Sequence, residues 1–199
     1  ILEKYKNVVV ILATVSIFFW LFCSVLHIIF FTDSIPLTWG YYRDINSFKN
    51  IYFETQTINF FKVDLKISAD ENIFYKNFYL VDLPGYGYAK TSKKNRKVWE
   101  KFIEEFLLNS REIKFVCQLI DLRHSPMDSD LKIFNWLVEK NLPVLCIATK
   151  SDKLSKSEQK KNLEIIKNSL QIDENSLLPY SSIKNEGRSE LLDVIVNNL

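Results

Sequence analysis

The stretch FYLVDLPGYGYAK, from Phe78 to Lys90, decides which fold to expect. Its apolar beginning, Phe78–Val81, has the composition of a buried strand, which would place Asp82 at the strand's carboxyl end. Pro84 and Gly85 are then expected to turn the chain sharply. A carboxylate at this point can order the water shell of a magnesium ion, and the Gly85 N–H can approach a terminal phosphate closely. The motif D-x-x-G also occurs by chance where a strand is followed by a turn. The rest of the sequence is therefore needed to distinguish a nucleotide-binding motif from an ordinary turn.

The composition fits one globular domain with a substantial core. The chain has 199 residues, of which 47% are hydrophobic and 25% charged. A net charge of +2 is too small to indicate nucleic-acid binding by itself. Cys23, Cys117 and Cys146 show no C-x-x-C spacing. This spacing favours reduced, packed thiols in a cytoplasmic protein over a disulfide or a metal site.

Apolar runs alternate with helical patterns along the chain. Residues 58–67 and 74–81, separated by the polar stretch SADEN, indicate an antiparallel strand pair. Continuous apolar runs at 115–120 and 143–148 are typical of buried parallel strands. Helices are predicted at 98–108 and at 187–199, and a short strand at 177–180. A further helix is expected to begin at an N-cap at Ser125, with Pro126 as its first residue, and another to run from the capping box Ser155–Glu158 to Leu170. The alternation predicts an α/β fold with a doubly wound, mostly parallel sheet.

Three loops of such a sheet should meet beyond the carboxyl ends of its strands, where open α/β sheets bind ligands. They are Asp82–Gly85, Thr149–Asp152 and Tyr180–Ser182. In the T-K-x-D loop, the Asp152 carboxylate can accept both the N1–H and the 2-amino hydrogens of guanine, which adenine does not present. The threonine can brace neighbouring loops, the stem of Lys150 can lie over the purine, and a backbone N–H of the S-S loop can reach the guanine O6. After a buried strand and in this order, the loops indicate a guanine nucleotide.

From about Thr55 to Leu199 the chain resembles the EngB (YihA/YsxC-like) family of P-loop GTPases. The resemblance rests on TQTINFF, NFYLVDLPGYGYAK, LIDLRHSPMDSDLKIFNWL, TKSDK and YSSIKNEG. It implies GTP or GDP as ligand, Mg²⁺ as cofactor, and a monomer that acts in assembly of the large ribosomal subunit, in contact with the subunit or its rRNA. The implied nucleotide-binding residues are Thr55, Gln56, Thr57, Asp82, Leu83, Pro84, Gly85, Thr149, Lys150, Ser151, Asp152, Tyr180, Ser181 and Ser182, with Thr55 and Asp82 as magnesium ligands.

The resemblance leaves the catalytic step open. Tyr86 follows the D-x-x-G glycine, where Ras-like proteins place a water-orienting Gln. Hydrolysis is therefore expected to be slow and to depend on another group or partner, and no catalytic residue is assigned. The alternative function is a non-hydrolysing, membrane-tethered interaction protein that keeps the GTPase fold but binds nucleotide poorly.

The chain departs from the family where the phosphates should bind. Family members carry G-x-x-x-x-G-K-[ST] upstream, whose backbone N–H groups, Lys and hydroxyl hold the phosphates and magnesium. Gly40 is the only glycine before Gly85, and no Gly-Lys pair occurs in the chain. Glu54 would also place a negative charge near the phosphates. We therefore expect residues 55–199 to form an EngB-type GTPase domain without a recognisable Walker A motif, and residues 1–54 to form an atypical N-terminal segment.

The atypical segment contains an apolar run, residues 8–31, that lacks Asp, Glu, Lys and Arg. The run is long enough to cross a membrane as a helix, so a membrane span, a buried segment and an artefactual N-terminus are open alternatives. In the intact fold a central strand precedes the phosphate loop. We expect that, if the domain folds, either a piece of the run, such as Val8–Ile11 or Ile28–Phe31, pairs into that position or the domain stands incomplete. A straight helix over the whole run could not fill the position at the same time.

Overall fold

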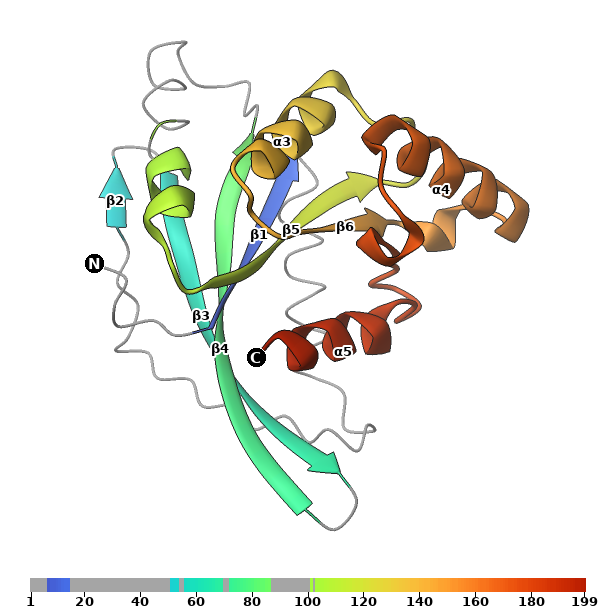
Figure 1. Cartoon of the computed structure of the whole chain (residues 1–199). Coiled ribbons are helices and arrows are strands. Elements are labelled where there is room, and N and C mark those ends of the chain that lie inside the picture. The colour runs from blue at the N-terminus through green and yellow to red at the C-terminus, as the bar shows by residue number, and fades with distance from the viewer. Residues whose placement is uncertain (1–6, 15–50, 54–55, 70–71, 87–100, 102) are drawn as a thin grey trace.

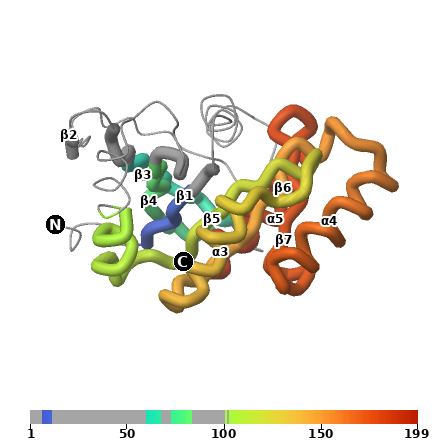
Figure 2. Tube along the Cα trace, turned by 90° about the horizontal axis from the view of Figure 1, so that it is seen from above, coloured from blue at the N-terminus to red at the C-terminus, as the bar shows by residue number. Residues whose placement is uncertain are grey.

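A seven-stranded sheet forms the centre of the computed structural model (Figure 1), which describes residues 7–14, 51–53, 56–69, 72–86, 101 and 103–199. The strands are β1 (Val8–Thr14), β2 (Ile51–Phe53), β3 (Gln56–Ala69), β4 (Asn72–Tyr86), β5 (Ile113–Asp121), β6 (Val144–Thr149) and β7 (Leu177–Pro179). Their order is β2-β3-β4-β1-β5-β6-β7, which the labels of Figure 2 follow across the molecule. All pairs from β4 to β7 are parallel, and the pairs β2–β3 and β3–β4 are antiparallel. The predicted α/β fold with a mostly parallel sheet is confirmed.

Helices cover both faces of this sheet. The helices α3 (Asp128–Glu139) and α4 (Lys156–Leu170), together with helical residues 103–109, contribute to the hydrophobic clusters on one face. The helix α5 (Arg188–Asn198) packs against the other face. Because side chains of a strand alternate between its two sides, the parallel strands between these layers contribute apolar side chains to both faces.

The central strand β1 comes from the apolar run at residues 8–31. Val8–Ile11 are buried and lie between β4 and β5, with Val9 opposite Leu80 on one side and Phe115 on the other. The prediction that part of this run occupies the central position is confirmed. β-Branched Val and Ile fit a strand that is buried on both faces.

The alternative of one continuous membrane helix over residues 8–31 is wrong for its first part, because Val8–Thr14 is a strand. Residues 15–31, including Ile28–Phe31, lie outside the described residues. Of the helices in the described ranges, none has both the length and the apolar character needed to cross a bilayer. β1 thus joins a part of the predicted N-terminal segment 1–54 to the sheet formed by later strands.

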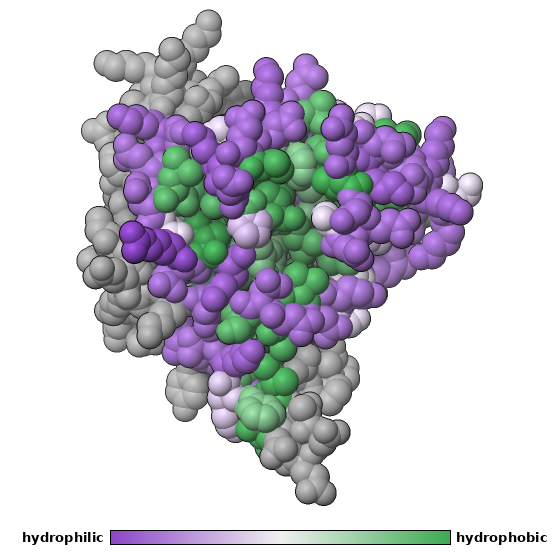
Figure 3. Space-filling model, viewed as in Figure 1, coloured by the Kyte–Doolittle hydropathy of each residue, from purple (hydrophilic) through white to green (hydrophobic). Residues whose placement is uncertain are grey.

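The long hairpin β3–β4 projects beyond the rest of the sheet (Figure 1). The two strands are paired from Asn59 and Asp82 to Ala69 and Asn72, which confirms the predicted antiparallel pair. Ile73, Phe74 and Tyr75 are exposed near its tip, and Figure 3 shows apolar side chains on this projecting part. The hairpin therefore carries apolar surface that the two helical layers leave exposed.

The expected end of β4 at Asp82, followed by a sharp turn at Pro84 and Gly85, is wrong. β4 continues to Tyr86, because pairing with β1 extends from Ile11 opposite Asp82 to Thr14 opposite Tyr86, with an irregularity on the way. Partners on a neighbouring strand keep the backbone extended where local sequence favours a turn. Asp82 therefore lies inside the strand and not at its end.

Two helix starts show what local signals can predict. The capping box at the start of α4 is confirmed: the Glu158 backbone N–H donates to Ser155 Oγ at 3.3 Å, and Glu158 Oε2 accepts from the Ser155 N–H at 2.8 Å. The predicted N-cap of α3 at Ser125 is wrong, because Met127 is the N-cap. Asp130 Oδ2 accepts a hydrogen bond from the Met127 N–H at 2.9 Å, so a side chain inside the helix satisfies the backbone donor of the N-cap.

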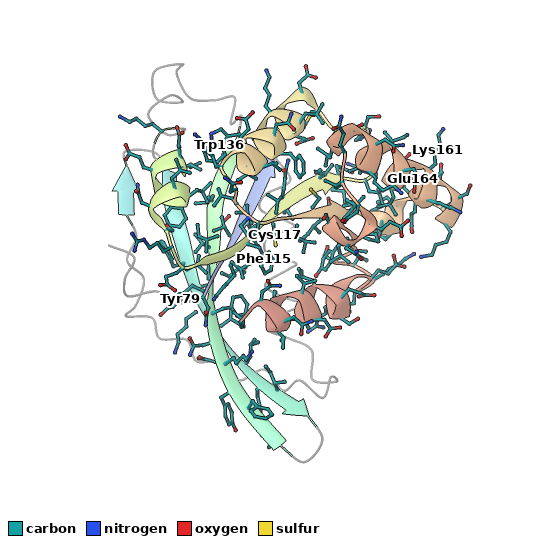
Figure 4. The ribbon with its side chains drawn as sticks, viewed as in Figure 1. Tyr79, Phe115, Cys117, Trp136, Lys161 and Glu164 are labelled. Atoms are coloured by element: carbon teal, nitrogen blue, oxygen red, sulfur yellow. The ribbon has the colours of Figure 1, made fainter. Side chains whose placement is uncertain are left out.

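Two of the predicted packed thiols lie in the described part of the chain. Cys117 and Cys146 are free and buried on neighbouring strands, and Figure 4 shows Cys117 close to Phe115 on β5. Burial raises the pKa of both thiols, that of Cys146 to about 12. They remain protonated and unreactive near neutral pH, as expected of core residues. Cys23 lies outside the described residues.

Candidate nucleotide-binding site

The loops that follow β6 and β7 meet at the carboxyl edge of the sheet. The strands place them side by side, because Asp121 of β5 is opposite Thr149 of β6, and Ala148 of β6 is opposite Pro179 of β7. The Ser151 N–H donates to the Tyr180 carbonyl oxygen at 3.1 Å, which links the two loops through their backbones. Two of the three predicted site loops therefore form one unit.

Asp152 is held within this unit by a side chain of the other loop. Its Oδ1 accepts a hydrogen bond from Ser181 Oγ at 2.8 Å, and its Oδ2 lies 3.3 Å from Lys153 Nζ. The Asp152 side chain is only 6% exposed. Burial alone would raise the pKa of Asp152, but the hydrogen bonds from Ser181 and Lys153 lower it below its ordinary value. The carboxylate is therefore ionised and fixed in direction, as an acceptor of two ligand N–H groups must be.

Thr149 and Lys150 connect the T-K-x-D loop to the end of β5. Thr149 is buried, and its Oγ1 donates to the Ile120 carbonyl oxygen at 3.0 Å. Lys150 has a left-handed backbone with φ of 63°, and its Nζ donates to Asp121 Oδ2 at 2.9 Å. The threonine thus fixes the loop through the backbone of the neighbouring strand, and the lysine fixes it through an ion pair.

Asp121 is a site residue that the sequence interpretation missed. Besides Lys150, it binds the guanidinium of Arg123, whose Nε donates to Oδ1 at 2.9 Å and whose Nη2 donates to Oδ2 at 2.7 Å. Burial of Asp121 acts to raise its pKa, but these hydrogen bonds hold the pKa well below its ordinary range. The available signal was the D-x-R spacing directly after a buried strand, which places a carboxylate and a guanidinium at the same strand end.

Glu186 is a second missed residue, on the opposite side of the loop pair. Its Oε2 accepts from Ser151 Oγ at 3.0 Å, and its backbone oxygen accepts from the Ser181 N–H at 3.0 Å. Gly187 follows with φ of +79°, and a Cβ at this position would overlap the Pro179 carbonyl oxygen. The sequence N-E-G carried the signal, because glycine after a polar loop often marks a backbone conformation that other residues rarely adopt.

The predicted residues Tyr180 and Ser182 differ in their surroundings. The Tyr180 side chain is buried in the core beneath α5, and burial raises its pKa to about 12. Its hydrogen bond with the T-K-x-D loop is made by its backbone oxygen. Ser182 is half-buried next to Ser181. Ser181 is fully buried, and its Oγ accepts from the Lys184 N–H at 3.1 Å, so the S-S loop is closed by its own hydrogen bond.

The phosphate side of the predicted site is described only in part. Asp82 is 4% exposed in β4, and Leu83 is buried in the core beneath the helical residues 103–109. Backbones of Gln56 and Thr57 in β3, and of Pro84 and Gly85 in β4, are placed in strands, whereas Thr55 lies outside the described residues. Within the ranges that the structure describes, no group of three or more His, Cys, Asp or Glu residues could hold a metal ion. β1 and β5 separate Asp82 on β4 from the T-K-x-D loop on β6.

Comparisons with known proteins agree with this arrangement. The sequence model of the family described as "50S ribosome-binding GTPase" matches residues 42–150. The "Probable GTP-binding protein EngB" of Clostridium kluyveri is 41% identical over 143 residues, which cover 71% of this chain and 67% of that protein. The protein of the same name from Shouchella clausii is 38% identical over 147 residues, which cover 73% of this chain and 69% of that protein.

Solved structures show the same fold at low sequence identity. The crystal structure of a probable GTP-binding protein engB superposes with a TM-score of 0.64 at 12% identity, over 96% of this chain and 98% of that chain. Era from Aquifex aeolicus, bound to GDP·AlF4⁻, superposes with a TM-score of 0.62 at 17% identity, over 98% of this chain and 57% of that chain. The sheet order and the loops after β6 and β7 thus define the chain as a protein of the P-loop GTPase fold.

The sequence relatives assign the chain to a narrower group within this fold. The chain belongs to the EngB family of GTP-binding proteins. The resemblance inferred from the sequence motifs is confirmed.

Proposed function

We propose that this chain binds guanine nucleotides through the loops Thr149–Asp152 and Tyr180–Ser182 and acts in the cytoplasm, as a monomer, in assembly of the large ribosomal subunit. The observation that carries the proposal is the ionised, nearly buried Asp152 carboxylate, which Ser181 Oγ holds at 2.8 Å. A carboxylate fixed in this way can accept the N1–H and 2-amino hydrogens of guanine. Family membership supports GTP or GDP as the ligand.

The other elements of this unit suit the remaining parts of a guanine base. Lys150 leads away from the end of β6 with its ammonium held at Asp121, so its four-carbon stem offers an apolar surface for a purine face. The Ser181 N–H already donates to the Glu186 backbone oxygen at 3.0 Å, so the S-S loop would offer the backbone N–H of Ser182 to the guanine O6. Ser151 and Tyr180 hold the two loops together from below.

The phosphate side of the proposed site rests on sequence. We assign Thr55 and Asp82 as ligands of Mg²⁺, with Gln56, Thr57, Leu83, Pro84 and Gly85 around the phosphates. The Asp82 carboxylate is a hard oxygen donor of the kind that magnesium prefers, and a bound ion would neutralise phosphate charge. Residues 55–199 then form an EngB-type GTPase domain that lacks a recognisable Walker A motif and that β1 completes as the central strand. Tyr86 after the D-x-x-G glycine supports slow hydrolysis that depends on a partner.

The ribosomal role is supported by the description of the matching family and tested by sedimentation. Purified chain mixed with large subunits should migrate with them in a sucrose gradient when guanine nucleotide is present, and less without it. No feature of the described residues favours the alternative of a membrane-tethered protein that does not hydrolyse nucleotide.

Base recognition is tested by a competition assay on the full chain. GDP should displace a fluorescent guanine nucleotide at least about tenfold better than ADP, because only guanine donates two hydrogens to Asp152. Asp152→Asn should remove that preference and admit xanthosine diphosphate. Asp64→Asn is the matched control, since it makes the same change in an exposed ion pair with Lys62 on β3. Equal displacement by GDP and ADP from the unsubstituted chain would contradict the proposal.

A further inference from the structure

The carboxylate of Asp121 is surrounded by donors on both of its oxygens. Oδ1 accepts from the Arg123 backbone N–H at 3.1 Å and from Arg123 Nε at 2.9 Å. Oδ2 accepts from Arg123 Nη2 at 2.7 Å and from Lys150 Nζ at 2.9 Å. The Asp121 side chain is 13% exposed, and that of Lys150 is 26% exposed. Two cations therefore converge on one carboxylate at a partly buried point of the site.

The three residues have different tasks in this cluster. Arg123 lies two residues from Asp121, and its planar guanidinium binds both carboxylate oxygens, which sets the direction of the carboxylate. Lys150 comes from the next strand end, 29 residues further along the chain. Among the described residues, Asp121 is the carboxylate that pairs with Lys150. The ion pair thus fixes the far end of a side chain that is otherwise highly flexible.

Fixing the Lys150 ammonium before a ligand arrives has a consequence for binding. A free lysine side chain loses rotamer freedom when a ligand packs against it, which weakens binding. Here the left-handed backbone at one end and the ion pair at the other already restrict the stem. A purine placed over the stem would therefore meet a surface that is already ordered.

We propose that Asp121 is a positioning residue for guanine binding: oriented by Arg123, it holds Lys150 so that the lysine stem forms a fixed platform for the base. The inference deepens the proposed function and rests on it. It assigns Asp121 no contact with the nucleotide, so the effect of Asp121 must pass through Lys150. A substitution at Asp121 should then have no effect once the Lys150 ammonium has been removed.

The test is a double-mutant cycle read by titration calorimetry with GDP and, in parallel, with guanosine. Asp121→Asn keeps the shape and removes the charge, and Lys150→Met keeps the apolar stem and removes the ammonium. Each substitution should weaken binding of both ligands by about tenfold, which corresponds to about 1.4 kcal/mol. The double variant should be no weaker than either single variant, because both substitutions remove the same interaction.

A purely electrostatic or purely structural role of Asp121 would give different results. If Asp121 acted only as a nearby negative charge, Asp121→Asn would strengthen GDP binding, because it removes repulsion from the phosphates. If Asp121 only stabilised the fold, Asp121→Asn would lower Tm without weakening the binding of either ligand to the folded chain. Asp64→Asn again serves as the control, and we expect it to leave both affinities unchanged.

The outcomes separate this inference from the proposed function. Binding of GDP and guanosine by the unsubstituted chain, with unchanged or tighter binding by Asp121→Asn, overturns the positioning role and leaves the proposed function standing. Losses that add fully in the double variant also overturn it. Failure of the unsubstituted chain to bind either ligand overturns the proposed function, and the role of Asp121 in guanine binding with it.

Discussion

The loops after β6 and β7 differ from the strand β4 in how their polar side chains are held. Around the T-K-x-D loop, Asp121, Asp152 and Glu186 each have partners from another loop or strand end. Beside β4, the described acidic residue of the predicted site is Asp82, which lies inside a strand among core residues. The first region has the form of a binding site, whereas the described side chains of β4 around Asp82 have the form of a sheet interior.

The difference follows from which segments of the chain form each region. The proposed base-binding side is built from residues 121–187, within one continuous part of the chain whose motifs match the family. The phosphate side also needs the loop directly after β1, and there the sequence has no Walker A motif. A fold of this kind can therefore retain one half of a site while the other half changes, provided that the central strand remains.

Both sides depend on the central strand β1, so a substitution that disrupts this strand should have the largest effect on stability. Val10 is fully buried in β1. Val10→Asp should abolish cooperative unfolding in a circular-dichroism melt, since an unpaired charge in the core costs more than about 4 kcal/mol. Deletion of residues 1–14 should do the same. A truncated chain that melts cooperatively at the same Tm would show that β1 has no core role.

Gly187 offers a way to disturb the base-binding side alone. Gly187→Ala should destabilise the chain by about 3 kcal/mol and weaken GDP binding, because the new Cβ would overlap the Pro179 carbonyl oxygen in a backbone with positive φ. Asn185→Gly is the control two residues away: Asn185 has φ of 57°, and glycine adopts that conformation freely. We expect a change in unfolding free energy within about 0.5 kcal/mol there. Equal stability of both variants in urea titrations would argue against the crowding at Pro179.

The pH dependence of stability gives the smallest effect. The pKa of Asp121 is lower in the folded chain than its ordinary value of about 4. Its contribution to stability is thus fully present above that ordinary value and is lost as pH falls towards the folded pKa. The Tm difference between the unsubstituted chain and Asp121→Asn should be constant from about pH 6 to 8 and should shrink below about pH 4. A difference that grows on acidification would contradict the assigned ion pairs.

Sequence predicted the strands well because buried parallel strands appear as continuous apolar runs, as at 115–120 and 143–148. The apolar run at 8–31 was ambiguous, because composition alone does not distinguish a buried strand from the start of an apolar helix. The end of β4 was missed because pairing with β1 overrode the turn signal of Pro84 and Gly85.

The motifs of the candidate site could be predicted from the sequence, but the side chains that hold those motifs in place could not. Asp152 and Ser181 belong to loops whose patterns are characteristic, so their positions could be inferred from the sequence. Asp121 and Glu186 act through side chains that lie 29 and 35 residues from their partners along the chain. Only the folded sheet brings these carboxylates to the T-K-x-D loop, and local sequence patterns do not record such distances.

The contributions of the base-binding side and the phosphate side to affinity are compared most directly by titration calorimetry on the full chain. Guanosine and GTP are the two ligands, each measured with and without Mg²⁺. If the base-binding side carries the affinity, the triphosphate should improve binding by no more than about tenfold, because the sequence has no Walker A motif to supply charge-assisted phosphate contacts. A magnesium-dependent gain of about a thousandfold or more, equivalent to about 4 kcal/mol, would show that another segment of this chain binds the phosphates and would contradict the account.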